Sequence, residues 1–197
     1  MSNTFKSAEQ SSTTSIGSGF SEVYTFEAYP VGSKRTQVAD EVASYGSGVV
    51  VATTPTAAQK LMLAGERTWV FVKSTGTIAA GDLCKRTADT DAYGAQQDNG
   101  DETAKWDLLG VADHAIASAS YGWIICKGPC VVQAVSAVNA GDLLASDGNT
   151  TPGEVSIVTG TGASMLAQSV IGIALEDADT PPTFGAGYVI AQIDIPA

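Results

Sequence analysis

Hydrophobic and polar residues alternate over short segments along most of this chain, which is the pattern of half-buried β-strands. The clearest case lies near the C-terminus, where the apolar positions are Val189, Ala191, Ile193 and Ile195. Further apolar segments predict strands at 23–29, 49–52, 69–72, 109–112 and 122–125. The sequence therefore predicts a mostly β fold of short strands joined by tight turns.

One segment carries helix signals instead. Thr54 suits an N-cap, Pro55 suits the first helical position, and Gly65 suits the C-terminal stop. The residues between them, TAAQKLMLA, contain no residue that breaks a helix. We expect at most one short helix in the fold.

A long internal repeat is the strongest feature of the sequence. Segment 69–84, WVFVKSTGTIAAGDLC, aligns without a gap with segment 129–144, PCVVQAVSAVNAGDLL. Further on, LGVA at 109–112 corresponds to IGIA at 171–174, and GWII at 122–125 corresponds to GYVI at 187–190. The offset between the copies thus grows from 60 to 62 to 65. The insertions fall in Gly-, Asp- and Pro-rich stretches, where loops tolerate them.

Each repeat predicts an apolar strand, a tight Ala-Gly-Asp-Leu turn, and three further strands: one that begins at the leucine, the Gly-(Val/Ile)-Ala strand, and a final strand that starts with an aromatic residue. Gly81 and Gly141 give these turns their backbone freedom, and Asp82 and Asp142 can accept hydrogen bonds from neighbouring backbone N–H groups. Two such units can form one β-barrel or sandwich, or two small linked ones. We divide the chain into an N-terminal arm (1–48), a first β unit with a preceding strand and short helix (49–128), and a second β unit (129–197).

Residues 1–19 are mostly small and polar. Such a segment buries too little apolar surface to offset the entropy lost on ordering. Two interpretations remain open, a disordered tail and an arm that becomes ordered on a neighbouring subunit. In the second interpretation Phe5, Ile16 and Phe20 are the anchors.

The formal net charge is −11, from 10 basic and 21 acidic residues. Proteins that neutralise phosphates need a basic surface, and an anionic membrane repels an acidic one, so we expect neither nucleic-acid nor membrane binding. The first residues lack the apolar stretch of a signal peptide. Three cysteines in a chain of 197 residues also argue against a disulfide framework. We therefore expect the chain to fold in a reducing cytoplasm.

The repeated strings VNAGDLLASDG, VIGIALEDAD and GAGYVIAQIDI, together with LLGVADHAIASASYGWIICKG, resemble phage capsid decoration (cement) proteins and related virion head proteins. The resemblance covers residues 67–197. It implies a β-rich, non-catalytic body that sits as an oligomer, often a trimer, on the outside of an icosahedral head. The implied partners are the major capsid protein and further copies of the chain, and the implied location is the capsid exterior of the virion.

In a decoration protein of this kind, three aromatic residues would form core and subunit contacts: Trp69, Trp123 and Tyr188. The alternative function is that of a head fibre or receptor-binding virion protein. Such a protein would grip a sugar with exposed aromatic side chains. The candidates are Tyr93, Trp106 and Phe184.

Candidate catalytic and metal-binding residues are few. Any Ser-His-Asp or Cys-His site would have to use the single histidine, His114, whose place after a predicted strand favours a loop or surface position. A zinc site would combine His114 with Cys84, Cys126 and Cys130, but the spacing matches no common finger or ribbon. Buried apolar thiols are the favoured interpretation.

Acidic residues gather in two predicted loops: Asp89, Asp91, Asp98, Asp101 and Glu102 in one, and Glu176, Asp177 and Asp179 in the other. Carboxylate oxygens can bind calcium, but no EF-hand pattern is present, so solvated loop charge is favoured. Lys127 lacks the flanking pattern of a biotinyl or lipoyl carrier lysine. We therefore expect no enzymatic activity, no metal and no cofactor.

Overall fold

The computed structural model describes residues 20, 22–37, 56–88, 91–99, 105–135, 138–146, 151–158, 170–178 and 187–197. Within these residues, ten strands form one continuous sheet, accompanied by one α-helix and one short 3₁₀ helix. The predicted mostly β fold with at most one short α-helix is confirmed. The elements are β1 (Lys34–Gln37), α1 (Ala57–Leu63), β2 (Arg67–Ser74), β3 (Leu83–Ala88), β4 (Asp91–Gln97), the 3₁₀ helix (Lys105–Asp107), β5 (Leu108–Ala112), β6 (Tyr121–Gln133), β7 (Leu143–Ser146), β8 (Val155–Ile157), β9 (Val170–Ala174) and β10 (Tyr188–Asp194).

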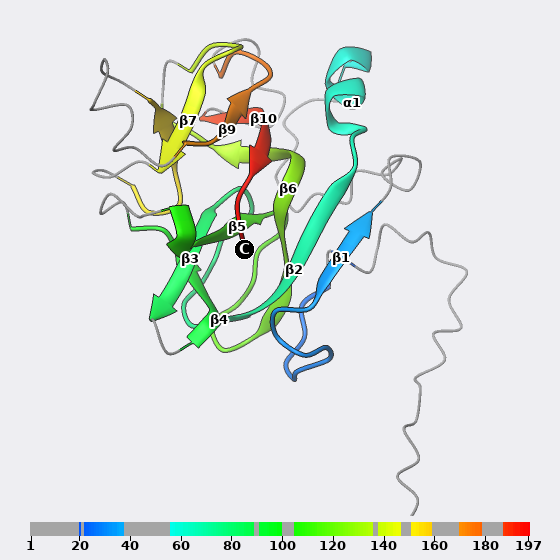
Figure 1. Cartoon of the computed structure of the whole chain (residues 1–197), viewed down its shortest axis with the longest axis vertical. Coiled ribbons are helices and arrows are strands. Elements are labelled where there is room, and N and C mark those ends of the chain that lie inside the picture. Colours follow the sequence, from blue (N-terminus) through cyan, green and yellow to red (C-terminus); the bar gives the residue numbers. More distant parts are fainter. Residues whose placement is uncertain are drawn as a thin grey trace, which may run out of the picture.

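The sheet closes on itself twice, so that each repeat forms its own small barrel (Figure 1). In the first barrel the strand order is β2, β4, β3, β5 and β6, and β6 pairs again with β2. In the second barrel the order is β6, β10, β9, β7 and β8, and a bridge between Ala134 and Val155 closes the ring. The duplicated unit therefore forms two linked barrels, one of the arrangements that the sequence left open.

Strand β6 belongs to both barrels. Its N-terminal half pairs with β2 and β5, and its C-terminal half, from Lys127 to Gln133, pairs with β10. The strand runs without interruption through residues 128 and 129, where the sequence division places the boundary between the two units. The barrels are thus joined by a continuous strand.

The two barrels repeat the same backbone hydrogen bonds. In the first, the N–H of Gly81 donates to the carbonyl of Ala112 at 2.7 Å, and the N–H of Ala112 donates to the carbonyl of Asp82 at 2.9 Å. The matching bonds of the second barrel, both 2.9 Å long, join Gly141, Ala174 and Asp142. The repeat seen in the sequence is therefore a repeat of structure.

The final strand of each repeat aligns differently from the sequence prediction. Val111 pairs with Ile125 in the first barrel, whereas its equivalent Ile173 pairs with Gln192 in the second. Residue 125 thus corresponds to residue 192, so the offset is 67 rather than the predicted 65. A slip of two residues keeps every side chain on the same face of a strand, so the alternation of polar and apolar residues could not reveal it.

The interiors of the two barrels are built from equivalent residues. The first interior contains Val70, Val72, Ile78, Cys84, Ala95, Leu109, Ala112, Ile116, Ile124 and Cys126. The second contains Cys130, Val132, Val138, Leu144, Val155, Ile171, Ala174, Ala178, Ala191 and Ile193. The outer faces of the strands are therefore the part of each barrel that is available for other contacts.

Helix α1 packs on the outer face of the second barrel. Thr56 forms a capping box with Gln59, because the Thr56 hydroxyl accepts from the Gln59 N–H at 3.2 Å and the Thr56 N–H donates to the Gln59 side chain at 3.0 Å. The predicted N-cap at Thr54 is wrong; this residue and Pro55 lie outside the described residues. Leu63 covers Val131 and Ile190, which explains why Ile190 is buried on the outer side of β10.

The predicted strand at 23–29 is wrong. Only Tyr24 of this segment makes a β-bridge, with Tyr121, and the rest is bent backbone whose aromatic side chains pack together. The strand that exists is β1, which pairs antiparallel with β2. The predicted strand at 49–52 lies outside the described residues.

Candidate functional site

Each barrel has the same Gly-Asp turn. We call residues 79–82 the first turn and residues 139–142 the second turn. The carboxylate of Asp82 accepts from the Ala79 N–H at 2.5 Å, and that of Asp142 accepts from the Asn139 N–H at 2.8 Å. The preceding glycines, Gly81 and Gly141, have φ angles of 89° and 93°, which favour glycine. Local sequence therefore builds two turns of the same geometry.

The first turn is buried against the second barrel. The N–H of Gln133 donates to the carbonyl of Gly81 at 2.8 Å, and the Tyr188 ring lies so close that a Cβ on Gly81 would be 2.6 Å from it. Ala80 packs in the cluster beneath α1. Burial raises the pKa of Asp82, although bonds from Ala79 and Gln97 act in the opposite direction. The first turn is thus a contact between the barrels.

The second turn and the strands beside it are open. Asn139, Ala140 and Gly141 are exposed, and apart from the adjacent residues no described atom lies within 4 Å of the place of a Cβ on Gly141. Leu143 and Ile173 face each other across β7 and β9 and are 41% and 37% exposed. Their equivalents in the first barrel, Leu83 and Val111, are fully buried. We call Leu143, Ile173 and residues 139–142 the second-turn face.

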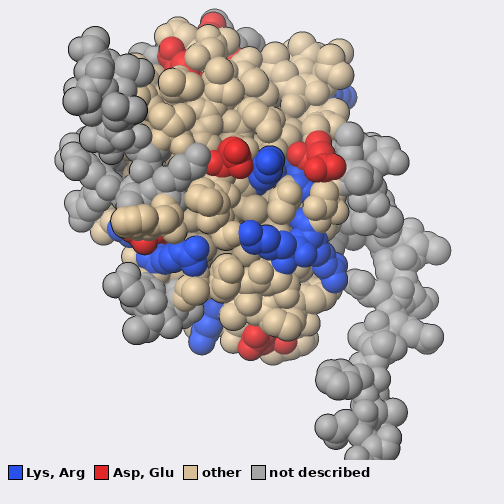
Figure 2. Space-filling model, viewed as in Figure 1, with Lys and Arg blue, Asp and Glu red and all other residues tan. Residues whose placement is uncertain are grey.

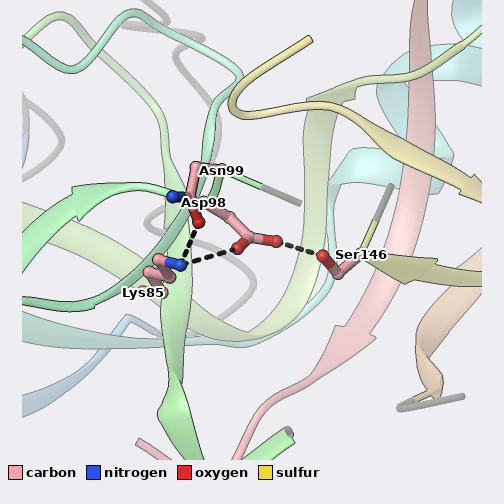
Figure 3. Close-up of polar contacts among 4 residues, drawn as sticks. All are labelled: Lys85, Asp98, Asn99 and Ser146. Atoms are coloured by element: carbon pink, nitrogen blue, oxygen red, sulfur yellow. Dashed lines mark hydrogen bonds and ion pairs between the residues drawn. The ribbon is translucent and has the colours of Figure 1, made fainter. Parts of the chain in front are cut away.

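A polar contact at the end of β4 ties the two barrels together (Figure 3). The carboxylate of Asp98 bonds with the Ser146 hydroxyl and lies 3.9 Å from the Lys85 ammonium, which also bonds with Asn99. The carbonyl of Asp98 accepts from the Gly153 N–H at 2.7 Å. Asp98 is 1% exposed, so the prediction that it is a solvated loop charge is wrong. The second barrel packs on the end of β4 and removes this carboxylate from water.

The other acidic residues of the two predicted loops have different positions. Glu176 accepts from the Gln59 side chain at 2.8 Å, so it links the second barrel to α1. Asp177 is exposed and accepts from the Ala140 N–H at 2.7 Å, which places it beside the second turn. Asp91 begins β4. The remaining members lie outside the described residues: Asp89, Asp101, Glu102 and Asp179.

An aromatic cluster covers the outer face of the first barrel. Phe20 stacks on Trp69 with ring centroids 4.8 Å apart and meets Trp123 edge-on at 5.7 Å, and Tyr29 lies 5.3 Å from Phe71. We call residues 20 and 22–33 the N-terminal cap. The two indole rings are buried within the chain and belong to its core. Phe5 and Ile16 lie outside the described residues.

The N-terminal cap also presents apolar side chains to solvent. Phe26 is 66% exposed and Val23 is 42% exposed. Basic side chains stand beside them, since Arg35 lies 4.4 Å from the Tyr29 ring centroid and Lys73 lies 5.9 Å from that of Tyr121. The cap therefore presents apolar side chains together with two exposed carboxylates, Glu22 and Glu27, and basic side chains border it.

His114 and Asp113 follow β5 and are buried, so the predicted surface position of His114 is wrong. Among the described residues, neither ring nitrogen of His114 has a hydrogen-bond partner, and burial lowers the pKa of the ring to about 4. A Cβ on Gly122 would lie 3.3 Å from Nε2. Burial raises the pKa of Asp113 to about 6, while the charge of Arg67 acts in the opposite direction. Both side chains belong to the packed interior.

The three cysteines are free thiols and all are buried: Cys84, Cys126 and Cys130. Burial raises the pKa of Cys130 to about 12. In the part of the chain that the structure describes, no three His, Cys, Asp or Glu side chains are grouped so that they could hold a metal ion. No helix among the described elements has the length and apolar character needed to cross a bilayer.

Charge is strongly segregated between the two repeats. Residues 129–197 contain seven acidic residues and no lysine or arginine, so all ten basic residues precede residue 129. Figure 2 shows Lys and Arg side chains across the middle and lower part of the view, where Figure 1 places the first barrel. The basic residues are thus confined to residues 1–128, which also contain fourteen acidic residues, whereas the second repeat has only acidic ones.

Comparisons with known proteins add little. No family model matches the sequence, and no curated protein is similar to it. The chain is similar to the crystal structure of the head fiber gp8.5 N base in bacteriophage phi29, with 16% sequence identity and a TM-score of 0.44. This likeness covers 64% of the present chain and 92% of the other. At such identity and TM-score we derive nothing about function from it.

Proposed function

We propose that this chain is a structural protein of a phage head, and that it acts as a decoration protein on the outer surface of the shell. One observation carries the proposal: the motifs on which the resemblance to decoration proteins rests are the ones that build each barrel. The Gly-Asp-Leu motif makes the turn, and the Gly-(Val/Ile)-Ala motif is the strand bonded to it. The motifs therefore mark whole structural units, in the same order twice.

The proposed mechanism is multivalent binding across subunit junctions of the major capsid protein. Several weak contacts to different subunits oppose their separation more strongly than any one contact does. We propose that the protein acts as a homotrimer, which multiplies those contacts. Residues 1–19 precede Phe20 in the sequence, and the Phe20 ring stacks on Trp69, so an arm that orders on a capsid subunit would be anchored at the first barrel.

We also propose that the chain has no enzymatic activity. The buried carboxylates of Asp82 and Asp98 have structural partners, because one closes a turn and the other joins the barrels. Asp142 closes the second turn in the same way. These groups hold the fold in place, which is what a scaffold requires of them.

Addition of the purified chain to phage heads that lack it tests this function. We expect saturable binding to the outside of the shell and a higher survival of the heads after heating or osmotic shock. A chain without residues 1–19 should bind more weakly, and a chain with Trp106→Ala should bind as the wild type does. Absence of binding, or equal survival with and without the chain, would overturn the proposal.

The exposed side chain of Trp106 favours a second candidate function, binding of a sugar on a receptor. Trp106 is 65% exposed, Tyr93 is half-buried, and Phe184 lies outside the described residues. An aromatic ring open to solvent can stack on the apolar face of a sugar. A glycan array should then show a ligand that the Trp106→Ala variant loses. An array without any bound glycan removes this candidate.

A further inference from the structure

We propose that the second-turn face is the docking site for the N-terminal cap of a second copy of this chain. The inference deepens the proposed function, because it assigns the surfaces through which the decoration protein would associate with itself. The two surfaces are different. Each copy would therefore bind one neighbour through its second-turn face and another neighbour through its N-terminal cap. Such a contact is heterologous.

The first barrel shows what the second-turn face is suited to contact. The same face of the first barrel, with Leu83 and Val111, is covered within the chain by the second barrel. There the first turn reaches the outer face of β6 and β10, where Gly81 bonds with Gln133 and contacts Tyr188. In the first barrel this face is therefore covered by a neighbouring barrel, and in the second barrel the equivalent face is exposed.

The register of the strands identifies the matching surface on the first barrel. Lys73 pairs with Tyr121 as Gln133 pairs with Tyr188, so these two pairs are equivalent. A turn that approached the first barrel as the first turn approaches the second would therefore arrive beside Lys73 and Tyr121. This is the border of the N-terminal cap, because Tyr24 bridges to Tyr121.

The two surfaces agree in apolar character. Leu143 and Ile173 form an exposed apolar pair, although β-strand residues with such side chains are usually covered. Val23 and Phe26 form the exposed apolar part of the N-terminal cap. An encounter between the two would remove four apolar side chains from water.

Charge also differs between the two surfaces: the second-turn face is acidic, and exposed basic side chains border the N-terminal cap. Asp142 and Asp177 stand at the second turn, in a repeat that has no basic residue. Lys34 and Arg35 are exposed on β1, and Lys73 is exposed on β2. The cap itself has two carboxylates with local partners, since Glu22 accepts from the Tyr24 hydroxyl and Glu27 from the Val31 N–H. Attraction between the carboxylates of the second turn and the basic side chains beside the cap would orient the copies head to tail.

The test uses the purified full-length chain and measures its mass in solution by native mass spectrometry and light scattering, over a range of protein and salt concentrations. We expect a closed oligomer of defined copy number that weakens as salt rises. Leu143→Glu breaks the second-turn face, and Phe26→Glu breaks the cap. Each variant alone should associate at least about tenfold more weakly, because a charge is placed in an apolar contact. Leu61→Glu, at an exposed leucine of α1, is the matched control and should leave the oligomer intact.

Mixing the two variants gives the decisive result. The Leu143→Glu copy keeps an intact cap, and the Phe26→Glu copy keeps an intact second-turn face, so the mixture should form a heterodimer and stop there. Circular dichroism and thermal melting check that each variant is folded. A monomeric wild-type chain, an oligomer that survives Leu143→Glu, a mixture without heterodimers, or loss of the oligomer only on deletion of residues 1–19 would each overturn the inference. Binding to phage heads is measured separately, so the proposed function can fail or stand independently of this result.

Discussion

The first and second turns have the same local sequence and the same hydrogen bonds, yet one is buried and the other is open. Both contain Ala-Gly-Asp-Leu, and in both the aspartate accepts from the backbone N–H three residues earlier. The first turn lies against the second barrel, whereas in the described part of the chain only the adjacent residues lie within 4 Å of the place of a Cβ on Gly141. Local sequence therefore decides the shape of a turn, and the neighbouring barrel decides whether the turn is solvated.

The largest expected effect compares the two leucines that follow the turns. Leu83→Ala should lower the free energy of unfolding by about 4 kcal/mol, because it leaves a cavity at a fully buried position. Leu143→Ala should lower it by less than about 1 kcal/mol, because that side chain is already 41% exposed. Urea unfolding at a protein concentration that keeps the chain monomeric measures both. Equal losses would mean that the second-turn face is covered in the monomer.

A second difference between the barrels follows β5 and β9, where the first barrel has Asp113 and His114 and the second has Leu175 and Glu176. The pKa of Asp113 is raised to about 6, so the folded state binds this proton more tightly than the unfolded state does. Its contribution to stability is therefore lost as the pH rises through about 6. The pKa of His114 is lowered to about 4, so its contribution is lost as the pH falls towards 4.

Single substitutions should separate these opposing effects. The Asp113→Asn variant keeps only His114 of these two titrating groups. Relative to the wild type, its free energy of unfolding should rise by about 3 kcal/mol between pH about 4 and 6. With His114→Gln only the aspartate remains, and stability should fall over the same range by a similar amount. Chemical unfolding at several pH values provides the profiles. Parallel profiles for the two variants would contradict the burial of one or both groups.

The glycines of the turns test the comparison directly. Gly81→Ala and Gly141→Ala both place a side chain at a positive φ, which costs about 1–2 kcal/mol. At Gly81 the new Cβ would also lie 2.6 Å from the Tyr188 ring, so this variant should lose about 2 kcal/mol more. Thermal melting of the two variants side by side measures the difference. A Gly141 variant as unstable as the Gly81 variant would show that the second turn has a close neighbour.

The smallest expected effect concerns the contact between the barrels in Figure 3. Ser146→Ala removes one hydrogen bond to the buried Asp98 and should lower stability by about 1 kcal/mol. Ser156→Ala, in the neighbouring strand β8, is a suitable control. Urea unfolding distinguishes them if the measurements are precise to a few tenths of a kcal/mol. Identical stability of the two variants would remove Ser146 from the contact.

The sequence was informative where the evidence is local. The spacing of Gly81 and Asp82 predicts a turn closed by the aspartate, and the repeat in 129–144 predicts a second one, because both devices need only a few consecutive residues. The register of the last strand was not predictable from alternation, since Ile125 can be aligned with Ile190 or Gln192 without changing a side-chain face.

Other features depend on residues far apart in the chain. Asp98 is buried because Ser146 and Gly153 meet it, and nothing near residue 98 indicates this. The segment 23–29 has the residue types of a strand, but its aromatic side chains lie in a cluster with Trp123 and Phe71 instead. In both cases contacts between distant residues decide the outcome: they bury the Asp98 carboxylate, and they override the strand propensity of segment 23–29.

The strand shared by the two barrels has a mechanical consequence. A load applied to one barrel, such as outward pressure beneath a bound protein, would pass to the other along the covalent backbone of β6 and its cross-strand bonds. Along this route β6 is one uninterrupted strand from Tyr121 to Gln133. Because both barrels include β6, removal of either one would disrupt the other. We therefore expect limited proteolysis and unfolding to show a single cooperative unit and not two independent domains.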